Sequence, residues 1–185
     1  LDELFLKTLG LSQLVYKTDL VTSKTLFIIT EGVNNPVLIE DDGDNLYVSF
    51  RGTDMYSGSN WWTNTTIRTR KFSDYDMFKK RMNLDKLSDL EIHKGFGDAM
   101  LITYDTVRLE IDTYRGRNLI LTGHSLGGAM ANLFYYIYER DVINVEKKLP
   151  ITHCVTFGSP RSIRNYEPYS IRYNTQCPNN IRIFN

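Results

Sequence analysis

The chain has 185 residues, 42% of them hydrophobic, with twelve tyrosines, nine phenylalanines and two tryptophans. This length allows one sizeable core and is short for two typical domains, so we expect a single domain spanning residues 1–185. Because 22 basic side chains balance 22 acidic ones, the zero net charge gives no indication of a nucleic-acid partner.

The first fifty residues predict helical structure followed by short strands. Residues 1–20 carry apolar side chains at near-helical spacing, and Gly10 interrupts them, which predicts a pair of short helices or one broken helix. Residues 26–29 predict a strand. Residues 37–40 and 46–50 predict two strands in tight connection, because a turn rich in aspartate and glycine joins them.

The rest of the chain alternates helical and strand patterns. After Gly97, an apolar stripe with helical spacing is formed by Met100, Tyr104, Val107, Leu109, Ile111 and Tyr114. The strand-like run 119–122 precedes a second helical pattern, and residues 151–157 and 181–184 are further strand candidates. Strands that alternate with helices of this length predict parallel crossover units. The fold class is therefore α/β, with a mainly parallel sheet covered by helices.

A polar stretch at about residues 55–92 departs from this alternation. It holds Trp61 and Trp62 and a set of basic residues, namely Arg68, Arg70, Lys71, Lys79, Lys80 and Arg81. Long excursions in compact domains are often lids or binding loops, so Trp61 and Trp62 are candidate lid or substrate contacts. The alternative is a solvated face with two structural tryptophans. If this stretch is a lid, its basic residues would favour binding to anionic lipid surfaces.

The motif with the clearest chemistry is Gly123-His124-Ser125-Leu126-Gly127, set between the strand-like run and the helical pattern. This is the sequence context of a nucleophile elbow, in which a serine occupies a strained turn. Ser125 is therefore the candidate nucleophile. The following helix would direct its N-terminal amides and its dipole at negative charge developing beside the serine oxygen.

Four ordered blocks resemble the fungal-type (class 3) lipases of the α/β-hydrolase superfamily. They are Val48 to Asp54, His93 to Phe96, Gly123 to Ala129 and Val155 to Arg161. The resemblance implies an α/β-hydrolase fold and hydrolysis of acylglycerols or related esters. It also implies that Leu126 and Thr53 form the oxyanion hole. The position of Thr53, after a glycine at a strand end, supports that role independently.

A catalytic serine also needs an imidazole and a carboxylate, which follow it in this fold. His153 is the only later histidine and stands in a strand that we expect to be buried, while Asp141, Glu146 and Glu167 fit surface charge better. His124 is expected to be a packing residue. We therefore find neither the triad Asp nor the triad His, and we expect a fragment whose fold is incomplete at the C-terminus. A complete protein that has lost its triad is the alternative.

These observations predict a carboxylic ester hydrolase, most of all a triacylglycerol-type lipase that works through an acyl-enzyme. The alternatives are a phospholipase or other esterase of the same fold, and an inactive lipid-binding or interaction module. We expect no metal or organic cofactor, and a lipid or ester substrate at a lipid–water interface. No run approaches a membrane span and no signal peptide is visible, and two cysteines are too few for a disulfide framework. Compartment and oligomeric state stay open.

Overall fold

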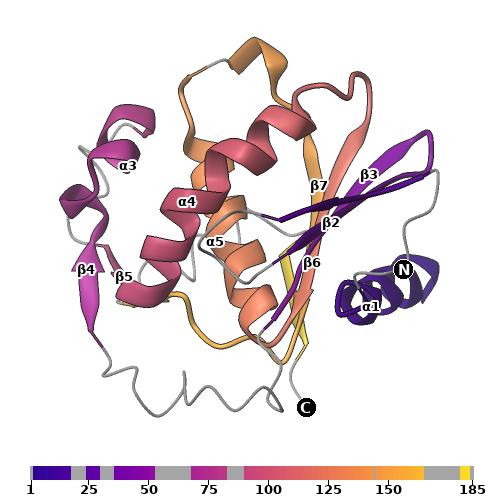
Figure 1. The fold of residues 1–185 in the computed structure, drawn as a ribbon, viewed down its shortest axis with the longest axis horizontal. Helices are drawn as coiled ribbons and strands as arrows, with labels where there is room; N and C mark the ends of the chain where they lie inside the picture. The colour runs from indigo at the N-terminus through magenta and orange to yellow at the C-terminus, as the bar shows by residue number, and fades with distance from the viewer. Residues whose placement is uncertain are drawn as a thin grey trace.

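A computed structural model describes residues 2–17, 24–29, 36–52, 68–82, 90–143, 145–164 and 180–183. Within these ranges a twisted sheet runs through the middle of the molecule and carries helices on both faces (Figure 1). Its six strands, in spatial order, are β1 (Thr25–Ile28), β2 (Val37–Asp41), β3 (Asn45–Phe50), β6 (Asn118–His124), β7 (Ile151–Phe157) and β9 (Asn180–Ile183).

The centre of the sheet is parallel, as the sequence predicted. β3, β6, β7 and β9 are parallel neighbours, whereas β1 and β2 pair antiparallel and β2 forms the expected hairpin with β3. The central strands are short apolar runs because both of their faces are covered, so alternation with polar residues is not needed. Leu121, for example, pairs with Val48 on one side and with Cys154 on the other, and all three are fully buried.

Helices α4 (Lys94–Ile111) and α5 (Leu126–Arg140) lie on one face of the sheet, and α1 (Asp2–Leu14) lies on the other (Figure 1). Helix α5 is buried on nearly all sides, which explains why its sequence is apolar almost throughout. Phe134 of α5 lies at the centre of this core, where its ring packs 5.4 Å from that of Phe50 and 5.2 Å from that of Tyr104. The core therefore fixes α5, and with it the turn from β6.

Two helix predictions were wrong in detail. Gly10 does not interrupt α1, because the helix runs through it with open space where a side chain would stand. The predicted stripe of α4 wrongly included Leu109, which is 58% exposed, and Tyr114, which follows the helix. The helix also begins at Lys94, ahead of Gly97, so its first turn buries Phe96.

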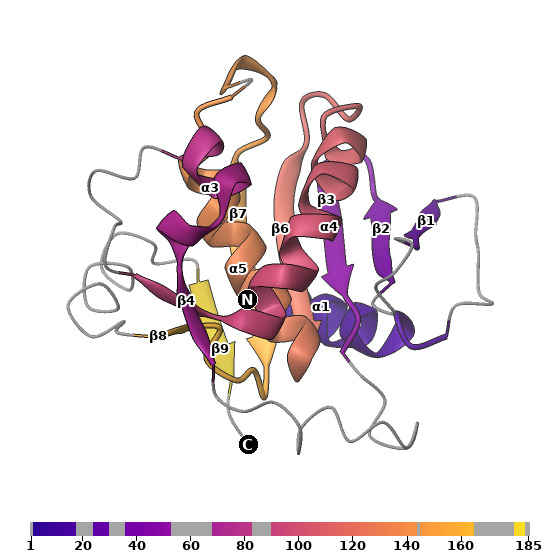
Figure 2. The ribbon, with the colours of Figure 1, turned by 60° about the vertical axis from the view of Figure 1, so that its left-hand side comes forward.

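A second, three-stranded sheet was not expected from the sequence. It consists of β4 (Thr69–Lys71), β5 (Glu91–His93) and β8 (Ile163–Arg164), and Figure 2 shows it in front of α5. The described part of the excursion also contains the short helices η1 (Phe72–Asp74) and α3 (Asp76–Arg81). One further short helix, η3 (Val145–Lys147), precedes β7. Strands of two or three residues are too short to show a period, which is why the sequence did not predict them.

Aromatic residues anchor this part of the excursion to the core. Phe72, Tyr75 and Phe78 are buried, and the rings of Phe72 and Tyr136 of α5 lie 5.4 Å apart. The described residues 68–82 are therefore a folded element with a buried face, and a solvated face alone does not account for them.

Asp141 ties the same element to α4, and its assignment to surface charge was wrong. Its carboxylate is buried and accepts hydrogen bonds from Arg81 Nη1 at 3.2 Å and from the Tyr104 hydroxyl at 2.9 Å. The amide of Ile143 donates a third bond at 2.8 Å. Burial, then the nearby Asp141 charge, raises the pKa of Tyr104 well above its ordinary value, so the phenol stays a donor.

Candidate active site

Ser125 stands alone between β6, which ends at His124, and α5, which begins at Leu126. Its backbone angles are φ 53° and ψ −125°, and no other non-glycine residue in the described ranges has a positive φ. Such a conformation costs of order 1–3 kcal/mol and persists only where the surroundings impose it. A strained serine at a sharp strand-to-helix turn is the geometry of a nucleophile elbow.

Hydrogen bonds on both sides hold the backbone of Ser125 in this conformation. Its amide donates to the carbonyl of Phe157 at the end of β7, at 2.9 Å, and its own carbonyl accepts from the amide of Gly128 at 3.0 Å. The side chain is half-buried, and none of the described residues hydrogen-bonds its hydroxyl. The hydroxyl is therefore available at the carboxyl edge of the sheet.

Glycines make the tight turn possible, as the sequence predicted. A side chain at Gly123 would overlap the carbonyl group of Gly127, and one at Gly127 would overlap the carbonyl oxygen of Phe50 in β3. In both cases the obstacle is backbone, which cannot rotate away as a side chain can. Strand β3, the elbow and the first turn of α5 are thus in direct backbone contact.

Leu126 is the first residue of α5, and its side chain is buried. Because the first amides of a helix have no carbonyl four residues earlier within the helix, they are free to bind an anion. The amide of Leu126 is adjacent to Ser125, so the helix start supplies positive electrostatic potential beside the serine.

Thr53, Trp61 and Trp62 lie outside the described residues, so their predicted roles stay predictions. The described residue before Thr53 is informative, however. A side chain at Gly52 would stand 2.8 Å from the carbonyl oxygen of His124 and 3.4 Å from the amide of Gly127. The chain therefore lies directly against the elbow at Gly52.

The ring of His124 packs edge-on against that of Tyr16, with ring centres 6.4 Å apart, in agreement with the packing role expected from the sequence. It is exposed, and its Nδ1 lies 3.5 Å from the hydroxyl of Tyr16, at the end of α1. The guanidinium of Arg51 lies over the ring of Tyr16, 5.5 Å from the ring centre. His124 and Tyr16 thus form a polar contact at the rim of the elbow.

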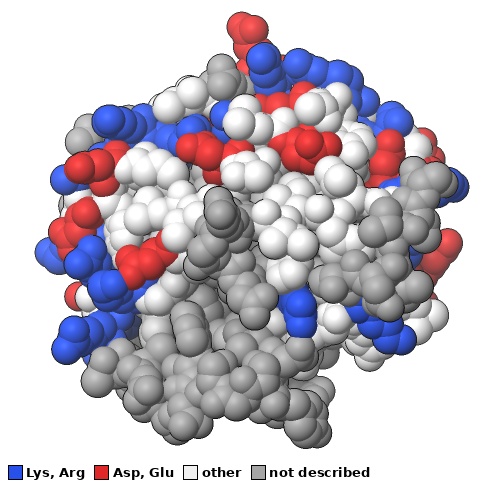
Figure 3. Space-filling model, viewed as in Figure 1, with Lys and Arg blue, Asp and Glu red and all other residues white. Residues whose placement is uncertain are grey.

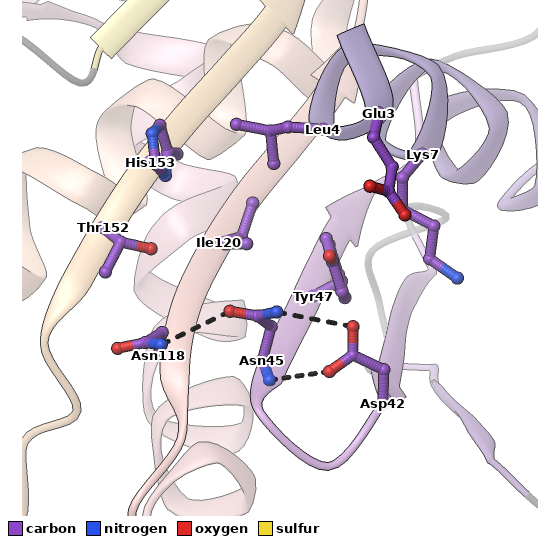
Figure 4. Close-up of a pocket in the computed structure, with 10 residues that line it drawn as sticks. All are labelled: Glu3, Leu4, Lys7, Asp42, Asn45, Tyr47, Asn118, Ile120, Thr152 and His153. Atoms are coloured by element: carbon purple, nitrogen blue, oxygen red, sulfur yellow. Dashed lines mark hydrogen bonds between the residues drawn. The ribbon is translucent and has the colours of Figure 1, made fainter. Parts of the chain in front are cut away.

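His153 was expected in a buried strand, but its position in β7 is not fully buried. It is half-buried and lines a pocket of about 660 Å³ between α1 and the start of the strands, together with Leu4, Ile120 and Thr152 (Figure 4). In the register of β6 and β7 it pairs with Ile120, five residues before Ser125, or roughly 16 Å along the strand. His153 is therefore at the opposite edge of the sheet from the serine.

His93 lies at the start of α4, with its ring 5.0 Å from that of Phe96. Its Nδ1 is buried without a hydrogen-bond partner, and burial lowers the pKa of the imidazole. Burial also lowers the pKa of His153. Both rings are consequently neutral near pH 7, and neither hydrogen-bonds Ser125.

Sequence reasoning missed the polar contacts that lie behind the elbow. Asn132 Nδ2 in α5 donates to the carbonyl of Gly128 at 3.1 Å and to the Thr156 hydroxyl at 3.4 Å. Arg182 Nη2 in β9 donates to the carbonyl of Ser159 at 2.7 Å. These residues are far apart along the chain, and the only available signal was a single asparagine on an otherwise apolar helix.

A metal centre finds no support in the described ranges, which contain no group of three or more His, Cys, Asp or Glu side chains placed to hold an ion. Cys154 is buried, and its thiol donates to Asn132 Oδ1 at 3.8 Å. Among the helices that the structure describes, none combines the length and the apolar composition needed to cross a bilayer.

The elbow, set in a mainly parallel sheet with helices on both faces, defines an α/β-hydrolase fold, and solved structures agree. A triacylglyceride lipase from Rhizomucor miehei is similar over 99% of this chain and 70% of its own, with a TM-score of 0.65 and 21% identity. A lipase from Rhizopus microsporus var. chinensis is similar over 99% of this chain and 65% of its own, with a TM-score of 0.64 and 20% identity.

The sequence itself identifies the family. Residues 47–185 match the lipase (class 3) family, and the chain belongs to that family. A curated relative, the lipase ZK262.3 of Caenorhabditis elegans, is 37% identical over 75 residues, which are 40% of this chain and 20% of that protein. The chain spans 58% to 70% of the Rhizomucor lipase chains. The predicted family and fold class are confirmed.

Proposed function

We propose that the protein hydrolyses carboxylic esters, with Ser125 as the nucleophile and triacylglycerols as the substrate class. The observation that carries this proposal is the positive φ of Ser125 between β6 and α5. A glycine would adopt this conformation with less strain, so the presence of a serine favours a chemical role for its hydroxyl.

Ser125 Oγ would attack the ester carbonyl, and the carbonyl oxygen would become an oxyanion. The amide of Leu126 and the amide and hydroxyl of Thr53 would stabilise this oxyanion, because fixed donors need no reorganisation as the charge develops. The close approach of Gly52 to the elbow supports the role of Thr53. Collapse of the intermediate releases the alcohol and leaves an acyl-enzyme, which water then hydrolyses.

The base that accepts the proton of Ser125 must lie within hydrogen-bond reach of its Oγ. His153 is at the wrong edge of the sheet, His124 contacts Tyr16, and His93 packs on Phe96. We propose that the histidine and its orienting carboxylate belong to sequence outside residues 1–185, and that Trp61 and Trp62 belong to a lid within the excursion at residues 55–92.

Hydrolysis of a soluble short-chain ester and of an emulsified long-chain triacylglycerol by the complete protein tests this proposal. Ser125→Ala should abolish both activities, with a loss of at least about a thousandfold in kcat. Unchanged hydrolysis in Ser125→Ala would exclude Ser125 as the nucleophile. Activity on soluble esters alone would favour a general esterase, and activity on phospholipids above triacylglycerols would favour a phospholipase.

A further inference from the structure

Basic residues outnumber acidic ones in one segment of the chain although the net charge is zero. Residues 68–82 contain six lysines or arginines and two aspartates, whereas the hairpin residues 40–45 contain four acidic residues and no basic one. Figure 3 shows blue side chains, with red ones among them, along its left edge, where β4 lies in Figure 1. The zero total therefore hides a local excess of positive charge in residues 68–82.

Five exposed basic side chains make up what we call the cationic surface: Arg68, Arg70, Lys71, Arg161 and Arg164. They come from β4, from β8 and from the residues just before these strands, and β5 is the only strand between β4 and β8. Arg68, Lys71 and Arg161 form no ion pair with any described residue. Arg70 lies over the ring of Tyr75, and Arg164 is 3.9 Å from Glu91.

The cationic surface lies beside the edge of the sheet that carries Ser125. The carbonyl of Arg68 accepts a hydrogen bond from the amide of Lys94, where α4 begins, at 2.8 Å. Helix α4 ends only a short turn before β6 starts, so its beginning lies toward the edge where β6 ends. Arg161 comes four residues after the end of β7, and the carboxyl end of β7 lies at the same edge of the sheet.

We propose that the cationic surface binds anionic lipid headgroups and so orients the Ser125 edge toward a negatively charged lipid surface. The inference rests on the proposed function, because a lipid surface is where long-chain esters are found. Exposed charges spread over a strand edge and its neighbouring loop suit a flat array of phosphates. Each such charge strengthens binding to an anionic surface about fivefold.

Binding is measured with the Ser125→Ala protein, so that no hydrolysis alters the lipid. Co-sedimentation with vesicles of phosphatidylcholine is compared with vesicles that also contain phosphatidylglycerol, at about 0.1 M and about 1 M salt, where the Debye length falls from about 10 Å to about 3 Å. We expect binding to the anionic vesicles at low salt, and a loss of that binding at high salt.

Arg68→Gln with Lys71→Gln should weaken this binding by roughly 30-fold, because two charges are removed. The matched control is Arg115→Gln with Lys147→Gln, which changes the net charge equally at the opposite edge of the sheet, before β6 and β7. The control pair should bind like the parent protein, and circular dichroism should show both pairs to be folded.

Equal binding to neutral and anionic vesicles would overturn the inference, as would equal losses in the two pairs. Hydrolysis of a soluble ester by the parent protein is measured in parallel. Binding to anionic vesicles without ester hydrolysis would contradict the proposed function but support lipid binding by the cationic surface. Ester hydrolysis without such binding would support the proposed function and overturn the inference about the cationic surface.

Discussion

At the scale of single residues, the strained backbone of Ser125 lowers the stability of the folded protein, whereas its hydroxyl is needed for the proposed chemistry. Glycine adopts a positive φ without strain, so Ser125→Gly should raise the free energy of unfolding by about 1 kcal/mol, after the larger chain entropy of glycine is subtracted. Ser125→Ala keeps the Cβ and should show no such gain. Urea unfolding of both variants measures the difference, and equal stabilities would contradict strain at this position.

Gly127 tests the backbone contact between β3 and α5. Gly127→Ala would place a methyl group against the carbonyl oxygen of Phe50, so the helix and the strand must separate, at a cost of about 3 kcal/mol or more. Gly10→Ala is the matched control, because that helical site has open space and should gain up to about 1 kcal/mol. Thermal or urea unfolding of the two variants should therefore change in opposite directions.

The elbow was predictable from single residues because its demands are local. A serine with a positive φ needs small neighbours, and the sequence shows them at Gly123 and Gly127. The surroundings of His124 and Asp141 were not predictable, because both depend on contacts with distant segments. Tyr16 is 108 positions from His124, and Arg81 is 60 positions from Asp141.

At the scale of elements, Asp141 is the polar link between α3, α4 and the end of α5. Asp141→Asn would leave the partly buried Arg81 with Asp105 as its carboxylate partner and should cost about 2 kcal/mol of stability. Tyr104→Phe removes only one neutral donor from the same carboxylate and should cost about 1 kcal/mol. Urea unfolding measures both, and a smaller loss for Asp141→Asn than for Tyr104→Phe would contradict this account.

The long elements were predicted well, and the short ones were not. The parallel strands and the helix of the elbow carry clear periods, so β6 and α5 agree with the sequence-based prediction. β4, β5 and β8 have two or three residues each and are held by pairing with one another and by buried aromatics such as Phe72 and Phe78. Such elements depend on tertiary contacts, which local patterns do not contain.

At the scale of the whole molecule, two histidines couple folding to pH. Burial lowers the pKa of His93 and of His153, so the folded protein binds fewer protons than the unfolded chain, in which histidine has a pKa of about 6.5. Stability should therefore be highest above about pH 7 and should fall as the pH drops through 6.5 toward the folded pKa values.

Urea unfolding between about pH 7.5 and pH 5 checks this expectation, since most carboxylates stay ionised in that range. Replacing both residues, as His93→Gln with His153→Gln, should flatten the dependence. An unchanged slope in the double variant would show that other groups take up the protons.

The proposal for Ser125 also depends on the whole molecule, because the elbow and the start of α5 can activate the serine only together with a base and an acid. The most direct measurement is labelling of the complete protein with a serine-directed phosphonate, followed by mass spectrometry of its peptides. We predict one adduct, on Ser125, that appears in step with the loss of ester hydrolysis and is absent from Ser125→Ala. Loss of hydrolysis with an adduct elsewhere, or hydrolysis that continues after Ser125 is fully labelled, would contradict the account.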